Sequence, residues 1–202
     1  MRHPFVVVVA GPNGSGKSEL VERIRLRSWA ENTTFLNADY IAEHELGDWN
    51  DPRARRRSAL ITGRRREDLI QKRTSFMCET VLTRLEFIER AKEQGFQSWM
   101  FYIATSSPAI NMERIRVRHQ QGGHFVPEDE VHKRYYRSIQ NCAEACMLVD
   151  RAFVFDNSVF DAFPTFLFRT THGKVRRVYQ QAFPAWANRV IQDLEVGEGA
   201  LS

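Results

Sequence analysis

A short apolar run that passes directly into a glycine-rich loop constrains this chain more than any other feature. Residues 5–10 read F-V-V-V-V-A, a β-branched run typical of a strand buried on both faces of a parallel sheet. Residues 11–18, G-P-N-G-S-G-K-S, match G-x-x-x-x-G-K-[ST], the Walker A phosphate-binding loop, in its strand–loop–helix context. A glycine-rich turn that binds nothing is the alternative, but every fixed position of the pattern is present. The sequence therefore predicts a nucleoside triphosphate site.

Each residue type in this loop has a physical reason. Glycines let successive backbone N–H groups point inward as an anion-binding nest, and the following helix adds its positive dipole end. Lys17 supplies a positive charge for the β- and γ-phosphates, and the Ser18 hydroxyl is placed to ligate Mg²⁺. We therefore expect the loop to bind ATP with Mg²⁺ through Gly11, Pro12, Asn13, Gly14, Ser15, Gly16, Lys17 and Ser18.

The order of apolar runs and helical patterns predicts an α/β fold. Strands are expected at residues 5–10, 33–36, 75–78, 97–104 and 152–155, with helices between them. Residues 165–171 and 174–180 predict an antiparallel hairpin, and an amphipathic helix follows around residues 186–194. We expect the three-layer P-loop NTPase fold, a five-stranded parallel sheet with helices on both faces, extended by this hairpin and helix. Residues 1–202 are predicted to form one domain, with a core at 1–158 and an extension at 159–202.

Cysteine usage and hydropathy indicate the compartment. The chain holds three cysteines, an odd number and none in a metal-like pair, which predicts a reducing cytoplasm and no disulfide framework. Cys142 and Cys146 lie one helical turn apart and are expected on a buried helix face. We find no stretch long enough to span a membrane.

The positive charge of the chain is concentrated in one segment. The net charge is +4, and residues 51–73 hold nine Lys/Arg against three Asp/Glu. The spacing of the apolar residues there predicts a helix buried on one face. A solvated basic face is the default interpretation, and a docking face for an acidic partner or nucleic acid is the alternative.

Three acidic residues are expected at the carboxyl ends of the strands, where the active sites of such sheets lie. Asp39 is the best candidate for the base that takes a proton from a substrate hydroxyl, although it also fits a helix N-cap. Glu79, followed by Thr80, could hydrogen-bond substrate hydroxyls or hold a neighbouring loop. Asp156 fits a turn-forming role better than a catalytic one.

A predicted helix after residue 107 carries arginines. Arg114 and Arg118 are four residues apart and share a helix face, whereas Arg116 points away. Guanidinium groups directed at a triphosphate would stabilise the charge of the transferred group, and Arg134 could join them. The glycine pair that follows would let the segment move as a lid. A solvated basic helix face is the alternative.

In their order along the chain, these motifs resemble the zeta-toxin family of P-loop kinases. The resemblance spans residues 5–158 and rests on the phosphate loop, N-A-D at 37–39, F-x-x-E-T at 76–80, R-x-x-x-R-x-x-x-G-G-H-x-V-P at 114–127 and D-N-S at 156–158. It implies transfer of the ATP γ-phosphate to a sugar hydroxyl, in the toxin branch that of UDP-N-acetylglucosamine. It implies Asp39 as the base, Glu79 as the substrate-binding acid, and Arg118 with Arg134 as lid arginines. Val81 departs from the family, which often has a second threonine there.

Two other functions fit parts of the sequence. The arginines between residues 53 and 73 suit a kinase that acts on a nucleic-acid end, although the small-molecule acceptor is preferred and nucleic acid is not the expected partner. A nucleotide-binding interaction module, such as a toxin-like protein held by an antitoxin, needs the phosphate loop but not Asp39 as a base.

Overall fold

The computed structural model describes residues 3–27, 30, 33–47 and 50–200. Its elements, in chain order, are β1 (Phe5–Ala10), α1 (Lys17–Arg25), β2 (Thr34–Leu36), α2 (Ala38–His44), α3 (Pro52–Gln71), β3 (Phe76–Thr80), α4 (Glu86–Glu93), β4 (Gln97–Ala104), α5 (Pro108–Gln120), α6 (Glu128–Leu148), β5 (Arg151–Asp156), β6 (Thr165–Thr171), β7 (Lys174–Val178), α7 (Ala185–Gln192) and β8 (Glu195–Val196). Within these described ranges, no helix is both long and apolar enough to cross a membrane.

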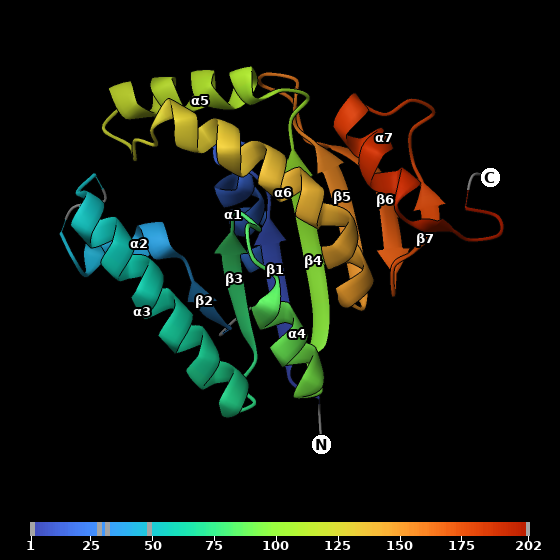
Figure 1. Ribbon diagram of the computed structural model, residues 1–202, viewed down its shortest axis with the longest axis horizontal. Coiled ribbons are helices and arrows are strands. Elements are labelled where there is room, and N and C mark those ends of the chain that lie inside the picture. Colours follow the sequence, from blue (N-terminus) through green and yellow to red (C-terminus); the bar gives the residue numbers. More distant parts are fainter. Residues whose placement is uncertain (1–2, 28–29, 31–32, 48–49, 201–202) are drawn as a thin grey trace.

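The strands form one sheet in the order β2-β3-β1-β4-β5-β6-β7-β8 (Figure 1). The first five in this order are parallel, as predicted. The sheet itself is larger than the predicted five strands, because the hairpin β6–β7 pairs antiparallel with β5 and β8 adds to β7. The hairpin thus extends the sheet beyond its parallel part.

The valine run of β1 lies at the centre of the molecule. Val6 and Val8 face the larger hydrophobic cluster, and Val7 and Val9 face a smaller one. All four side chains are fully buried, because β1 has strands on both sides and packed side chains on both faces. This explains why the strand reads as a continuous apolar run.

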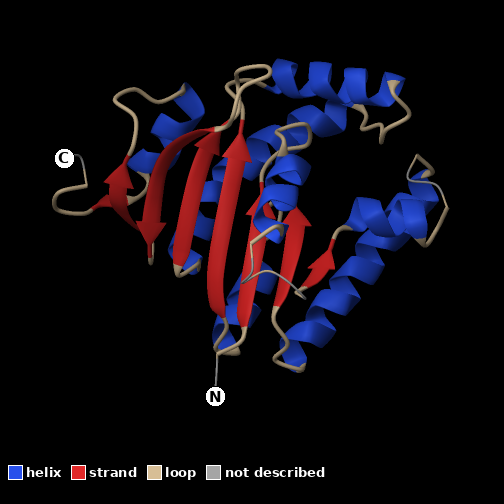
Figure 2. Cartoon of the chain, turned by 180° about the vertical axis from the view of Figure 1, so that it is seen from behind, coloured by secondary structure: helices blue, strands red, loops and turns tan. Residues whose placement is uncertain are grey.

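The two faces of the sheet are covered unequally. Residues of α4, α6 and α7 contribute to the larger cluster on one face. On the other face, Val21 and Ile24 of α1 pack against β1 and β3. Figure 2 shows β4, β5 and β6 from this side with no helix in front of them. Aromatic side chains stack across these strands instead, with ring centroids 4.9 Å apart for Phe101–Phe153 and 4.7 Å for Phe155–Phe166.

Local side-chain hydrogen bonds differ between the helix starts. The second helix begins at Ala38, because the Asn37 side chain caps it by accepting from the Asp39 and Tyr40 N–H groups. Asp39 is therefore not the cap but lies in the first turn. Ser107 precedes α5 as predicted, but its side chain makes no capping hydrogen bond. The predicted basic helix is α3, and both Cys142 and Cys146 are buried on α6.

Candidate functional site

The phosphate loop connects β1 to α1 at the carboxyl edge of the sheet, and α5 crosses beyond that edge (Figure 1). Two of its glycines are required by their surroundings. Gly14 has φ +77°, and a Cβ there would lie 2.6 Å from the Asn111 carbonyl oxygen. Gly16 has φ +97°, and a Cβ there would overlap the Asn157 amide. The loop therefore combines left-handed backbone with close approach of two neighbours, which only glycine allows.

Two buried asparagines hold the loop carbonyls. Asn111 Nδ2 donates to the Asn13 carbonyl at 2.7 Å, and Asn157 Nδ2 donates to the Ser15 carbonyl at 2.9 Å. Asn111 is held in turn by Thr105, whose hydroxyl donates to its Oδ1. With these two carbonyls held, loop N–H groups other than those of Gly11 and Ser15, which bond the Thr80 and Pro12 carbonyls, can face an anion. Sequence reasoning missed Asn111 and included Asn157 only as part of the D-N-S motif.

Lys17 and Glu79 form the charged centre of the site. The Lys17 ammonium donates to the Pro12 carbonyl at 2.8 Å and lies 3.9 Å from a Glu79 carboxylate oxygen. Burial lowers the pKa of Lys17 and raises the pKa of Glu79, and each partner opposes the shift of the other. Glu79 also accepts from Ser18 Oγ at 3.4 Å and from Asn37 Nδ2 at 3.0 Å. The cluster connects the phosphate loop, β3 and the start of α2.

Asp39 lies at the entrance of this cluster. Its side chain is 47% exposed, and Oδ1 lies 3.8 Å from Nε2 of the buried His124. Asn37 fixes the helix turn that presents it, since the same amide group that caps α2 also donates to Glu79. The structure thus places Asp39, Glu79 and Lys17 on one cavity wall.

The predicted lid arginines lie in different places. Arg114 and Arg118 of α5 both line the cavity above the phosphate loop. Arg118 donates to the His124 carbonyl at 3.0 Å, and Arg114 donates to the Val159 carbonyl at 3.1 Å. Arg116 points away and pairs with Glu113 at 2.7 Å. Arg134 of α6 instead lines the cavity beside α3, where it pairs with Glu130 at 2.6 Å.

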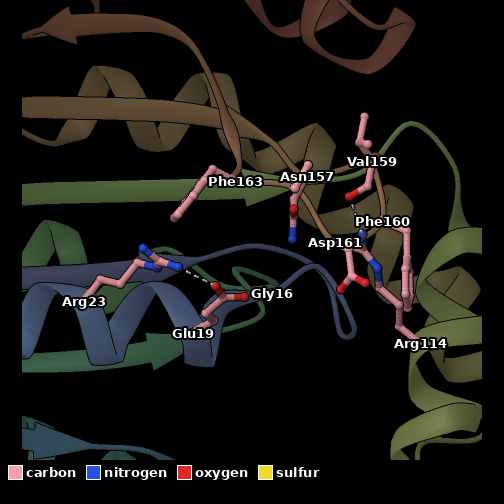
Figure 3. Close-up of a pocket in the computed structure, with 10 residues that line it drawn as sticks. Gly16, Glu19, Arg23, Arg114, Asn157, Val159, Phe160, Asp161 and Phe163 are labelled. Atoms are coloured by element: carbon pink, nitrogen blue, oxygen red, sulfur yellow. Dashed lines mark hydrogen bonds and ion pairs between the residues drawn. The ribbon is translucent and has the colours of Figure 1, made fainter.

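Three adjoining cavities surround these groups. The loop cavity, about 390 Å³, lies between α1 and residues 157–163. Figure 3 shows Glu19 and Arg23 on one side of it and Arg114, Phe160 and Asp161 on the other. The central cavity, about 200 Å³, lies between the phosphate loop and α5. The basic cavity, about 550 Å³, lies between the loop, α3 and α4.

The central cavity shares walls with both neighbours. Gly16, Glu19 and Arg114 line both the loop cavity and the central cavity. Asn13, Lys17, Asp39 and Glu79 line both the central cavity and the basic cavity. The three spaces are therefore neighbours, and the phosphate loop lies at the middle of the row.

The basic cavity carries an excess of positive charge. Its lining includes three carboxylates, Asp39, Glu79 and Glu86, against Lys17, Arg55, Arg66, Arg84, Arg90 and Arg134. Arg66 lies 4.0 Å over the Phe87 ring, and burial lowers its pKa. Among the described residues, Arg55 Nε is buried without a hydrogen-bond partner. Guanidinium groups held this way are suited to an anion.

Thr80 and Ser18 contribute hydroxyl groups near the loop. The Thr80 hydroxyl accepts from the Leu82 N–H at 3.1 Å, and its carbonyl accepts from the Gly11 N–H at 3.2 Å. Ser18 Oγ faces the Glu79 carboxylate at the central cavity. Mg²⁺ takes few protein oxygens when it also binds substrate phosphates. Ser18 Oγ and the Glu79 carboxylate oxygen that faces it therefore fit the expected metal position.

Comparisons with known proteins identify the family of the chain. An uncharacterized protein of Haemophilus influenzae is 33% identical over 138 residues, which is 64% of this chain and 91% of the relative. The AvrRxo1-ORF1:-ORF2 complex with ATP has a TM-score of 0.65 at 13% identity, and the match covers 96% of this chain but only 64% of that one. A structure of the PezAT toxin–antitoxin system of Streptococcus pneumoniae has a TM-score of 0.59 at 15% identity, covering 98% of this chain and 80% of that one. The zeta toxin family model matches residues 1–163, and this chain is a member of the zeta toxin family.

Proposed function

We propose that this protein is an ATP-dependent kinase that transfers the γ-phosphoryl group to the hydroxyl of a small molecule, with UDP-N-acetylglucosamine as the candidate acceptor that family membership suggests. One observation carries the proposal. Lys17, Asp39 and Glu79 line the wall between the central cavity and the basic cavity. A triphosphate on the loop and an acceptor in the basic cavity would therefore meet at a lysine and two carboxylates.

Each group has a role that its position supports. Lys17 and the loop N–H groups hold the β- and γ-phosphates, and Arg118 stabilises charge on the transferred group. Asp39 orients the acceptor hydroxyl and takes its proton as the new O–P bond forms, while the bond from the γ-phosphorus to the β–γ bridging oxygen breaks and ADP leaves. Glu79 holds acceptor hydroxyls, and the nucleoside occupies the loop cavity. Arg114 and Asn157 line that cavity.

Mg²⁺ is the cofactor that this chemistry needs. Ser18 is the residue that would ligate it, with Glu79 facing the same position at 3.4 Å. When bound with ATP, the ion would supply positive charge beside the phosphates. Before the ion binds, the Ser18 hydroxyl is kept oriented by its hydrogen bond to Glu79.

The arginines of the basic cavity support an acceptor that carries negative charge. Arg55 and Arg66 lie on the cavity side of α3, and the small residues Ser58, Thr62 and Gly63 line the cavity between them. This surface suits a diphosphate or phosphate group on the acceptor. A neutral sugar would bring no negative charge to these guanidinium groups.

The exposed arginines of α3 are less suited to an acceptor. Arg53, Arg57 and Arg64 are exposed, whereas Arg55 and Arg66 line the cavity. Helical geometry places residues 55 and 57 about 200° apart around the axis. A nucleic acid lying along the exposed face would therefore not enter the basic cavity, which favours the small acceptor.

The similar structures suggest a protein partner, and the cysteines suggest the compartment. Two similar structures are complexes with a second component, one described as a toxin–antitoxin system. We extend this to an antitoxin protein for this chain. All three cysteines are buried and free, which supports a reducing cytoplasm.

A transfer assay with γ-labelled ATP tests the proposal. The acceptors are UDP-N-acetylglucosamine, N-acetylglucosamine 1-phosphate, N-acetylglucosamine and a 5′-hydroxyl oligonucleotide, with Lys17→Ala as the blank. We expect transfer to a phosphorylated sugar and a KM for that acceptor at least tenfold higher in Arg66→Ala. Arg57→Ala, on the opposite face of the same helix, is the matched control and should leave KM unchanged. No label on any sugar, or label only on the oligonucleotide, would refute the proposal.

A further inference from the structure

The part of the chain beyond the family match reaches back to the nucleotide site through one side chain. The zeta toxin model ends at residue 163, and β6, β7, α7 and β8 follow it. Trp186 of α7 is 5% exposed, and its indole Nε1 donates to Asp156 Oδ1 at 3.0 Å. We propose that Trp186 is a positioning residue that holds the β5–β6 loop in the conformation that binds ATP, an inference that rests on the proposed function.

Asp156 is the last residue of β5, and its carboxylate closes the turn that follows. Its Oδ2 accepts from the Ser158 N–H at 3.1 Å, and its Oδ1 accepts from the Ser158 hydroxyl at 2.9 Å. The same hydroxyl oxygen accepts from the Ser106 N–H at 2.7 Å. The Trp186 indole adds a bond from a different layer of the fold, so the carboxylate is fixed from both sides.

This turn presents the residues that contact the phosphate loop and line the loop cavity. Asn157 lies between Asp156 and Ser158 and donates its side-chain N–H to the Ser15 carbonyl. Its amide also lies where a Cβ on Gly16 would be. Two residues further on, the Val159 carbonyl accepts from Arg114. A change in the turn would therefore move the Asn157 amide, which bonds the phosphate loop, together with one wall of the loop cavity.

The indole N–H is the part of Trp186 that performs this role. The ring itself packs beside Tyr102, with centroids 5.8 Å apart, and phenylalanine could fill much of that space. Phenylalanine has no N–H and would leave Asp156 without its bond to α7. Packing and positioning can therefore be separated by one substitution.

The experiment measures ATP affinity, which needs no knowledge of the acceptor. Isothermal titration of MgATP is run on the wild type, Trp186→Phe and Val190→Ala, with thermal melts of each. Val190 is the matched control, because it is a buried residue of the same helix at 1% exposure that lies in the hydrophobic core. We expect Trp186→Phe to weaken ATP binding about three- to tenfold, less than the full loss of a hydrogen bond to a charged group, because the bond acts on ATP only through the β5–β6 turn. Val190→Ala should lower the melting temperature and leave ATP affinity within twofold.

A second variant addresses the same bond from the other side. Asp156→Ala should also weaken ATP binding, and adding Trp186→Phe to it should cause little further loss, because both changes remove one interaction. Unchanged affinity in Trp186→Phe, equal loss in Val190→Ala, or additive losses in the double variant would each overturn the inference. If the wild type binds no ATP, the proposed function fails first and this inference falls with it.

Discussion

Replacing Asp39 by asparagine separates a catalytic carboxylate from a structural one. The substitution keeps the shape of the side chain and removes its charge. Asp39 is not the cap of α2, since Asn37 accepts from the N–H groups of residues 39 and 40. The backbone of the first turn therefore stays held in the variant.

The expected magnitudes differ widely between the two roles. Loss of a general base lowers the transfer rate roughly a hundredfold or more. Loss of one acid in a first helical turn costs about 0.3–1 kcal/mol, and less here because the side chain is 47% exposed. For a chain of this size, that corresponds to a melting temperature lower by at most about 4 °C. Nucleotide affinity should stay within a few-fold, since the loop itself is unchanged.

The assay compares phosphoryl transfer, ATP binding and thermal melting of Asp39→Asn with those of Asp51→Asn. Asp51 caps α3 by accepting from the Arg53 N–H at 2.9 Å. Asparagine caps a helix about as well as aspartate, so this control should match the wild type in all three measurements. Transfer by Asp39→Asn at the wild-type rate would show that the proton acceptor lies elsewhere.

Three further substitutions test the neighbouring groups. Lys17→Ala should abolish turnover while circular dichroism stays unchanged, because the proposed role of the ammonium is to bind phosphate charge and the hydrophobic clusters of the described residues do not include it; full turnover would refute this role. Arg118→Ala should lower kcat far more than it weakens ATP binding, whereas Arg116→Ala, whose side chain pairs with Glu113 at 70% exposure, should do little; equal kinetic effects would contradict the proposed direction of α5. Burial raises the pKa of Glu79, so folding favours its protonated form and the ionised form costs stability above the folded pKa. Glu79→Gln should therefore melt higher than the wild type at pH 8, with the gap narrowing as the pH falls toward 4.5, and a gap independent of pH would argue against a buried carboxylate.

Local sequence signals predicted the parallel part of the sheet well. The bounds of β4 agree with the prediction at both ends, because an apolar run with a glycine before it leaves little freedom. The hairpin was also predicted, but its pairing with β5 depends on an edge that exists only after the parallel strands have assembled. A hairpin sequence contains no signal for which edge it joins.

The hydrogen bonds from Asn111 and Asn157 to the phosphate loop could not be predicted from the sequence. Asn111 and Asn157 bind loop carbonyls that lie 98 and 142 residues away along the chain. An asparagine at a helix start or after a strand has common local uses, and nothing in its neighbours indicates a distant carbonyl. The roles assigned to Asp39, Glu79 and the arginines stay predictions until the variants are measured.

The hydrogen bonds of Asn111 also set the point about which α5 can rotate. Asn111 lies in the first turns of this helix and is bonded both to the phosphate loop and to Thr105. Any swing of α5 that preserves these bonds must pivot there, and the helix then acts as a lever. Arg114 lies about one turn from the pivot and Arg118 about two, roughly 10 Å along the axis. Arg118 therefore travels about twice as far as Arg114 for the same rotation, so a swing of α5 would displace Arg118 at the central cavity more than Arg114.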